Sequence, residues 1–322
     1  MIFLNQVFLT INGKGIMPMR LLTRSDFDGL ACGVLLKEAG IIDEWKFVHP
    51  KDMQDGIIEV SENDVLANVP FVPGCGLWFD HHSSEEERLE LKGRYEGESR
   101  LAPSAARVIY DYYGGKDAFP NLGDMMTAVD KTDSGQLTVE EIINPQKWIL
   151  LSFIMDPRTG LGRFQDYRIS NYQLMENLID YCRQMPIEDI MELPDIKERI
   201  SRYYEQDSLF REMLKKYSYT KDNVLITDLR GVETIYTGNR FLVYSLYPEQ
   251  NISVWIIDGR NKENCVISAG HSIINRTSQT DVGSLLLKYG GGGHRKVGTC
   301  QVPYEEADKT IEAIVTRLRE NG

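Results

Sequence analysis

The sequence predicts an α/β protein of two domains, in which an N-terminal domain with a parallel sheet is joined by a helical linker to a smaller α/β domain. Three observations support this fold class. The chain has 322 residues, about two domains' worth. In its first half, short apolar runs ending in polar or turn residues alternate with helical patterns. After residue 221, short β-type runs are followed by further helical patterns.

In the N-terminal part, residues 20–23 predict a strand, residues 25–29 a turn and residues 30–38 a helix ending at Gly40. The order strand, acidic loop, helix is typical of the start of an α/β domain. Further short apolar strands are expected at 44–48, 64–67 and 77–79, and helices at 102–113, 121–130 and 146–182, the last interrupted by a loop at 156–160.

Residues 186–217 are charged and helix-rich, with apolar residues at three- and four-residue steps. The runs VLITDL, FLVYSLY, SVWIID and CVISAG then predict strands, followed by helices at 281–288 and 304–319. We therefore expect a first domain over 19–185, a linker over 186–220 and a second domain over 221–322. Residues 1–18 lack the basic segment of a signal peptide and are expected to be an upstream start or a short added strand.

Composition limits the kind of partner. The chain has 36 Lys and Arg against 48 Asp and Glu, a formal net charge of −12, which argues against a broad basic face for long duplex DNA. It does not exclude a local basic pocket for a short anionic substrate. No run of 18 apolar residues is present, so no membrane partner is expected. Five dispersed cysteines without a C-x-x-C pair predict free thiols and a cytoplasmic location.

The most distinctive motif is Trp78-Phe79-Asp80-His81-His82, an apolar strand that ends in three consecutive potential metal ligands. Ligands of open α/β sheets bind beyond the ends of the strands, and imidazole with carboxylate suits Mn, Zn or Fe. Asp26 and Asp28, also just past a strand, can converge on the same crevice, with Gly29 allowing close backbone approach. Taken singly, Asp-x-Asp-Gly is usually a turn, and the two histidines can be a cap or a surface feature. Their combination at element ends favours a metallohydrolase.

Two further candidates follow from the sequence. The segment Asp130-Lys131-Thr132-Asp133-Ser134-Gly135 ends a predicted helix with acids, which could instead be a helix terminus or ion-pair partners. The second candidate is the glycine run 290–293, followed by His294, Arg295 and Lys296. Free backbone N–H groups and cationic side chains could together bind phosphate, although a helix cap and turn would also explain a glycine there. Ser268, His271, Asn275 and Arg276 could face the same cavity.

The motifs SDFDG, WFDHH and GGGGH, in this order along the chain, resemble the DHH phosphoesterases with a DHH-associated C-terminal domain. This superfamily includes RecJ-type exonucleases, nanoRNases, cyclic dinucleotide phosphodiesterases and exopolyphosphatases, and the chain looks most like the exopolyphosphatase-related group. The resemblance extends from about residue 20 to 322 and implies a dinuclear metal site, usually manganese, in the N-terminal domain.

The resemblance also implies roles for individual residues. The metal ligands would be Asp26, Asp28, Asp80, His81 and Asp130. Asp80 and His82 would be catalytic, with His82 toward the substrate phosphate. The non-reacting end of the substrate would be held by Gly291, Gly292, Gly293, His294, Arg276 and His271.

The sequence departs from the family pattern at two metal positions. The ligand expected upstream of Asp26 is missing, because Leu22, Thr23, Arg24 and Ser25 occupy that region, and Asn68 stands where a bridging Asp is expected. The centre could therefore hold two ions, one or none, and Arg24 could place positive charge where an ion would have been. In the C-terminal domain, Ser268-Ala269-Gly270 replaces the Ser-x-Arg that is frequent in the family.

The expected function is metal-dependent hydrolysis of a phosphodiester or phosphoanhydride bond in a short oligonucleotide, a nucleotide or polyphosphate, with one or two Mn²⁺ ions, or Mg²⁺ in their place. The alternative is a nucleotide-binding or nucleic-acid-binding protein of the same fold with weakened catalysis, which Asn68 favours. A weaker alternative is an interaction scaffold in which the 186–217 helices mediate dimerisation, and a homodimer is compatible with each of these functions.

Overall fold

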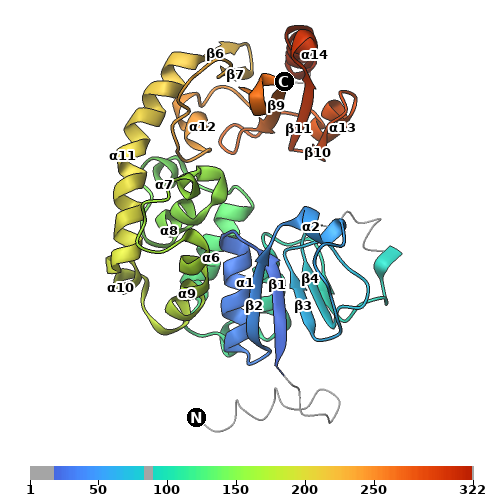
Figure 1. Ribbon diagram of the computed structural model, residues 1–322, viewed down its shortest axis with the longest axis vertical. Coiled ribbons are helices and arrows are strands. Elements are labelled where there is room, and N and C mark those ends of the chain that lie inside the picture. The colour runs from blue at the N-terminus through green and yellow to red at the C-terminus, as the bar shows by residue number, and fades with distance from the viewer. Residues whose placement is uncertain (1–17, 83–89, 321–322) are drawn as a thin grey trace. The chain divides into compact units, whose positions relative to one another are not determined.

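The computed structural model describes residues 18–82 and 90–320. The expectation for residues 1–18 lies almost wholly outside this range. The described chain forms two compact units (Figure 1). The first comprises residues up to 136 together with 146–200, and the second comprises 137–145 together with 201–322. The domain boundaries expected from the sequence, 19–185, 186–220 and 221–322, remain our proposal for how the chain divides functionally.

The first unit is built on a parallel sheet, as the sequence predicts. In the described residues it has five strands in the order β2-β1-β3-β4-β5, and every neighbouring pair is parallel. The strands are β1 (Met19–Arg24), β2 (Ile42–Val48), β3 (Asp64–Ala67), β4 (Leu77–Asp80) and β5 (Gly97–Ser99). The chain reverses its direction of winding between β1 and β3, and such a switch point opens a crevice at the carboxyl ends of the two strands.

Helices cover one face of this sheet. Gly33 of α1 (Phe27–Glu38) faces Leu21 of β1, and Phe79 of β4 packs edge-on against Tyr112 of α4 (Ala105–Tyr112). The other face packs around Leu22, Leu66 and Trp78, which pair across three strands. The remaining helical elements of this unit are α2 (Pro50–Gln54), α5 (Gly115–Ala118), α6 (Gly123–Asp133), α8 (Lys147–Met155), η2 (Pro157–Thr159), η3 (Leu161–Arg163), α9 (Asn171–Gln184) and α10 (Ile187–Glu192).

The second unit contains a mixed sheet. In the described chain its order is β10-β11-β9-β8-β7-β6, and only the β7–β8 pair is parallel. The strands are β6 (Ser218–Lys221), β7 (Val224–Asp228), β8 (Ile252–Asp258), β9 (Asn264–His271), β10 (Gly292–His294) and β11 (Val297–Pro303). One face of this sheet packs against α13 (Val282–Leu287) and α14 (Ala307–Glu320). The long helix α11 (Pro194–Tyr217) leads into it, and the short elements η4 (Arg260–Lys262) and η5 (Tyr304–Glu306) complete it.

One predicted strand is wrong. The run FLVYSLY forms the helix α12 (Leu242–Leu246), which packs against α7 (Val139–Ile143). A run of about seven apolar residues does not distinguish a buried strand from a buried helix, because either can be apolar throughout. Here the neighbour decides the conformation: α7 lies about 100 residues earlier in the chain, and the Asn239 amide before α12 donates to the Ile142 carbonyl.

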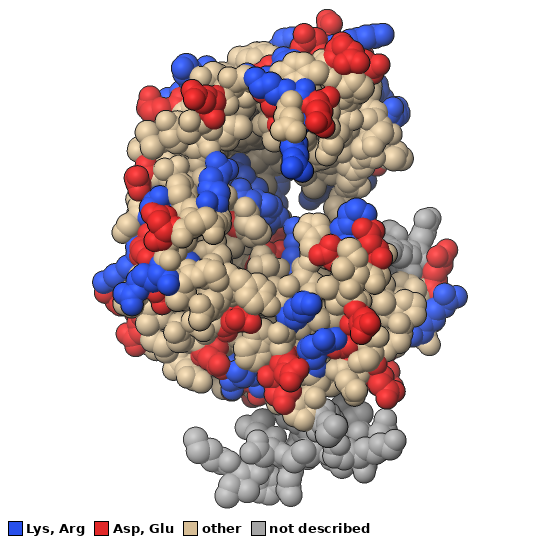
Figure 2. All heavy atoms as spheres, in the orientation of Figure 1, with Lys and Arg blue, Asp and Glu red and all other residues tan. Residues whose placement is uncertain are grey.

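The predicted free thiols are confirmed, since all five cysteines, each among the described residues, are unpaired. No helix in the described segments has both the length and the apolar character needed to cross a bilayer. On the face shown in Figure 2, Lys and Arg side chains are interspersed with Asp and Glu side chains.

Candidate metal centre

The candidate centre lies where β1, β3 and β4 of the first unit end. Asp26 follows β1, Asn68 follows β3, and Asp80 is the last residue of β4. These are the carboxyl ends of neighbouring parallel strands, on either side of the switch point between β1 and β3. All three side chains are buried. The sheet therefore brings together polar groups that are up to 54 residues apart in the sequence.

The SDFDG motif forms the start of α1. Asp26 is the N-cap residue, and its Oδ1 accepts a hydrogen bond from the Gly29 backbone N–H at 3.0 Å. Gly29 is required here because a Cβ at this position would lie 1.9 Å from the Arg24 carbonyl oxygen. The motif thus forms a turn, as its residue types suggest. This turn directs the Asp28 side chain into the protein.

Asp28 is fixed by the start of another helix. Its two carboxylate oxygens accept the backbone N–H groups of Ala105 at 2.9 Å and Ala106 at 2.8 Å, at the N-terminus of α4. The first N–H groups of a helix have no partner within it, and the helix dipole favours negative charge there. Asp28 is therefore held in one orientation although it is almost fully buried.

The two histidines of the Asp-His-His triplet have different partners. The His82 ring Nδ1 lies 3.1 Å from Asp80 Oδ1, and the His82 backbone N–H donates to Asp80 Oδ2. His81 points elsewhere: its Nδ1 lies 3.1 Å from the Ala102 carbonyl oxygen, which can only accept a hydrogen bond. Nδ1 therefore carries the proton, and the Nε2 lone pair is left for a ligand.

The Nε2 atom of His81 faces two carboxylates. It lies 3.6 Å from Asp28 Oδ2 and 3.2 Å from Asp133 Oδ2, and it is buried without a hydrogen-bond partner among the described residues. One potential ligand atom from each of Asp28, His81 and Asp133 lies within 4.8 Å of the others. Two carboxylate oxygens and one neutral imidazole nitrogen form a donor set that fits a divalent ion.

Asp133 stands where the sequence led us to expect Asp130. Both belong to the last turn and a half of α6, but Asp130 binds Arg107 at 2.6 Å and accepts a hydrogen bond from Ser104 at 2.8 Å. Asp130 therefore joins α6 to the start of α4, and it is outside the group formed by Asp28, His81 and Asp133. We propose Asp133 as the ligand in its place.

Burial and like charge shape the protonation of this group. Burial, and then the charges of Asp133 and Asp26, raise the pKa of Asp28. Burial also raises the pKa of Asp133, although the charge of the His81 ring acts in the opposite direction and lowers it. Burial lowers the pKa of His81 and so favours the neutral ring that ligates metals. Keeping these buried carboxylates ionised and close together therefore costs free energy, which a bound cation would offset.

Cationic side chains surround the acids. Arg24 Nε lies 3.1 Å from Asp26 Oδ2. Arg158, in η2, pairs with Asp156 at 2.8 Å; burial lowers the pKa of its guanidinium, but the charges of Asp156, Asp26 and Asp133 outweigh this and raise it. Nothing in the local sequence identifies Arg158, which follows Asp133 by 25 residues.

The predicted phosphate-binding residues lie in the second unit. Gly292, Gly293 and His294 form β10, paired with β11, so part of the expected anion-binding loop is an edge strand. Gly291 and Gly293 are needed there because a Cβ at either position would lie 2.2 Å from a carbonyl oxygen of the neighbouring strand. The His271 ring is anchored to the Thr280 carbonyl at 2.8 Å, and its backbone N–H donates to the Lys296 carbonyl.

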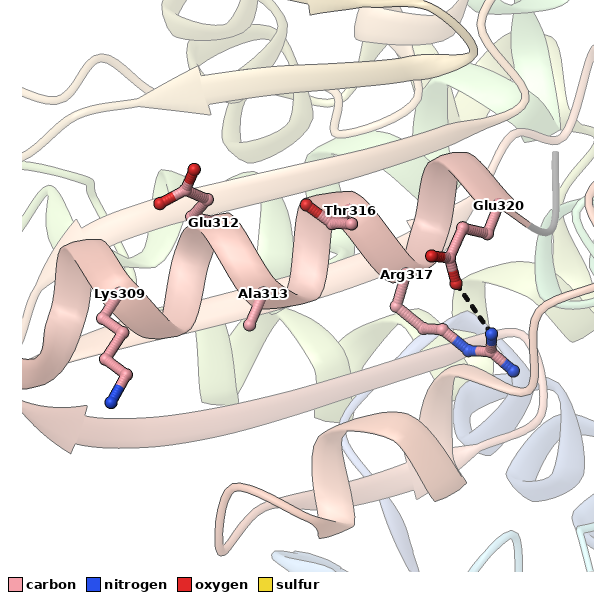
Figure 3. A pocket seen from close by; sticks show the side chains of 6 residues that line it. All are labelled: Lys309, Glu312, Ala313, Thr316, Arg317 and Glu320. Atoms are coloured by element: carbon pink, nitrogen blue, oxygen red, sulfur yellow. Dashed lines mark hydrogen bonds and ion pairs between the residues drawn. The ribbon is translucent and has the colours of Figure 1, made fainter.

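Arg276 is placed in the loop that follows His271, where its Nε donates to the Ile273 carbonyl. The structure therefore brings His271 next to the segment after the glycine run, while Arg276 is held by its own loop. A separate shallow depression on the exposed side of α14 is lined by Lys309, Glu312, Ala313, Thr316, Arg317 and Glu320 (Figure 3). It has no buried ligand group, and Arg317 pairs with Glu320 within it.

A parallel sheet whose switch point brings together two carboxylates and an imidazole, beside a histidine held by a carboxylate, has the donor groups that a metal-dependent hydrolase needs. Neither the scan against protein-family models nor the search of curated proteins found a match. Among solved structures, the pGpG-specific phosphodiesterase PggH from Vibrio cholerae is 46% identical, with a TM-score of 0.83 over 94% of this chain and 100% of that one. The DHH domain of a member of the s1p family of ribosomal proteins is 13% identical, with a TM-score of 0.52 over 93% of this chain and 86% of that one.

The chain belongs to the DHH family of phosphoesterases. It is therefore a phosphoesterase, a hydrolase of phosphate ester bonds. The resemblance inferred from WFDHH, SDFDG and GGGGH is thereby confirmed, as is the two-domain α/β fold class.

Proposed function

We propose that this protein hydrolyses the phosphodiester bond of a short 5′-phosphorylated dinucleotide of the pGpG type, giving two mononucleotides. The observation that carries the proposal is the 46% identity to a pGpG-specific phosphodiesterase over the whole length of that chain. It is supported by the convergence of Asp28, His81 and Asp133 at the switch point of the sheet. Longer oligonucleotides and polyphosphate are the competing substrates.

The donor set favours Mn²⁺ over Mg²⁺, because imidazole nitrogen is a poor ligand for Mg²⁺. A divalent ion held there would supply charge neutralisation at the phosphoryl group and would activate water as the nucleophile. Asp28 and Asp133 would hold the ion with their negative charge, and the α4 N-terminus and the Ala102 carbonyl fix the orientation of Asp28 and His81.

We propose that His82 acts on the substrate. Burial disfavours its charged form, but the hydrogen bond and charge of Asp80 outweigh burial and raise the pKa of His82. The ring is partly exposed while Asp80 is buried. A cationic imidazole held in this way can donate a hydrogen bond to a phosphoryl oxygen and a proton to the leaving oxygen.

The decisive measurement is hydrolysis of pGpG, a longer oligoribonucleotide and polyphosphate by the Mn²⁺-loaded protein, with Asp80→Ala as the control. We expect pGpG to be cleaved faster than the other two and the control to lose turnover by about 100-fold or more. Equal rates for all three substrates would contradict the dinucleotide specificity. No turnover above the control, together with retained nucleotide binding, would favour the alternative of a binding protein with weakened catalysis.

We propose that Gly291, Gly292, Gly293, His294, His271 and Arg276 hold the non-reacting end of the substrate. Replacing His294 with Ala should raise KM several-fold and leave kcat nearly unchanged, because a group that binds ground state and transition state equally affects KM alone. Steady-state kinetics with pGpG measure this, with His49→Ala as a control because that exposed ring caps α2. A loss in kcat with unchanged KM would instead place His294 with the reacting groups.

Two expectations remain proposals. The free cysteines favour a reducing cytoplasm. A homodimer is compatible with the function, and its test is the molecular mass in solution.

A further inference from the structure

We propose that the centre holds a single divalent ion and that the Arg24 guanidinium, fixed by Asp26, supplies the second positive charge to the substrate phosphate. The proposal rests on the phosphoesterase function described above and specifies how its site is built. It departs from the dinuclear centre that the family resemblance implies.

The first observation concerns Asp26, whose carboxylate is already engaged. Oδ1 accepts hydrogen bonds from the Gly29 backbone at 3.0 Å and from the Asn68 amide nitrogen at 2.9 Å, and Oδ2 lies 3.1 Å from Arg24 Nε. Three of the roughly four lone-pair directions of a carboxylate are thereby used. Asp26 is therefore held as an ion-pair and capping residue, whereas Asp28 and Asp133 face the unpartnered nitrogen of His81.

The second observation concerns Asn68, which is buried beside Asp26. Its amide nitrogen donates a hydrogen bond directly to the carboxylate, so the two side chains satisfy each other without a bridging cation. An Asp at this position would oppose Asp26 with like charge and would need a cation between them. The neutral amide removes that requirement. Its Oδ1 is buried and has no hydrogen-bond partner among the described residues.

The third observation concerns Arg24 itself, the last residue of β1. Its side chain is 35% exposed while that of Asp26 is 7% exposed, so the guanidinium is anchored on one side and accessible on the other. A guanidinium is permanently charged and matches two phosphate oxygens in a bidentate geometry. Arg24 can therefore neutralise phosphate charge while Asp26 holds it in place.

Metal stoichiometry tests the proposal without relying on activity. The wild-type protein is equilibrated with Mn²⁺ alone by dialysis, and bound manganese per chain is measured by elemental analysis. We expect saturation at one ion per chain. Saturation at two ions, with hydrolysis intact, would overturn this proposal and leave the proposed function standing. No bound ion and no hydrolysis would overturn both.

Variants then test Arg24. Arg24→Gln keeps a hydrogen-bond donor for Asp26 but removes the charge; it should still bind one Mn²⁺, at least as tightly as the wild type, and bind GMP about tenfold more weakly, because one charge-assisted contact is lost. Arg24→Lys should lose less GMP affinity. The matched control is Arg183→Gln, whose guanidinium pairs with Glu38 and Asp180. Unchanged GMP affinity in Arg24→Gln, or loss of its Mn²⁺, would contradict the proposal.

A gain-of-ligand variant completes the test. Arg24→His combined with Asn68→Asp provides two new ligands and removes the competing cation, so it should bind a second Mn²⁺ per chain. Thermal unfolding with and without Mn²⁺ checks that each variant is folded, because an ion that binds only the native state raises the melting temperature. A folded double variant that still binds only one ion would contradict the role we assign to Arg24 and Asn68 in excluding the second.

Discussion

Replacing Asp133 with asparagine should abolish Mn²⁺ binding and lower turnover by at least about 100-fold, because loss of a direct ligand exceeds the 10–100-fold typical of outer-shell changes. The metal-free protein should not be destabilised by this change. Burial raises the pKa of Asp133 above its ordinary value of 3.8. The native state therefore binds its proton more tightly than the unfolded state does, and the free energy of unfolding contributed by Asp133 falls as the pH rises above about 4. Asparagine removes this dependence.

Asp130→Asn is the matched control. Asp130 lies three residues earlier in α6, but it binds Arg107 and Ser104 instead of facing His81. We expect this variant to keep one Mn²⁺ and most of its turnover while losing about 1.5–3 kcal/mol of unfolding free energy, the usual range for hydrogen bonds to charged groups. Elemental analysis, pGpG hydrolysis and denaturant titrations of both variants separate the two roles. If Asp130→Asn lost the metal and Asp133→Asn kept it, Asp130 would be the ligand, as the sequence predicted, and our assignment of Asp133 would be wrong.

Replacing Gly29 with alanine should have the second large effect, on folding and metal binding together. The new Cβ would lie 1.9 Å from the Arg24 carbonyl and 2.8 Å from Thr23 Oγ1. Since the Arg24 carbonyl is backbone, the first turn of α1 must move, and with it Asp26 and Asp28. We expect a loss of more than about 3 kcal/mol in unfolding free energy, at the upper end of what overpacking costs. Denaturant titration and Mn²⁺ binding measure the two consequences.

Gly123→Ala is the control for that substitution. Gly123 also lies in the first turn of a helix, α6, but a Cβ there would meet no atom within 4 Å. Alanine has the higher helix propensity, so this variant should be as stable as the wild type or slightly more so. If the two variants had equal unfolding free energies and equal Mn²⁺ binding, the close approach of Gly29 to the Arg24 carbonyl would not be what shapes the acidic loop.

These residues also show how far the sequence alone could lead. The strand ending at Asp80 and the helix after Asp26 were predictable, because apolar runs and polar ends are local signals. The choice between Asp130 and Asp133 was not. Residues three apart lie on neighbouring faces of a helix, and only the position of His81, about 50 residues earlier, decides which carboxylate meets it. Arg158 gave no signal, since its approach to the acids depends on how α8 and η2 fold back.

The glycine run shows a different limit. Its composition predicted a loop with free N–H groups, yet Gly292 and Gly293 pair with β11. The glycines are required by close approach of the neighbouring backbone, which has no local signature. The substrate-binding roles of these residues, like the ligand roles in the first unit, remain proposals that the variants above address.

The short helix α7 has a consequence for how the protein is made. It belongs to the second unit, but residues 146–200 of the first unit are synthesised after it. Its Ile142 is buried, and its partner α12 emerges from the ribosome only about 100 residues later. A fragment beginning at residue 221 would lack α7 and leave the α12 surface without its cover. The second unit can therefore complete its fold only after synthesis has passed α12, and dissecting the protein at a single cut would break that unit.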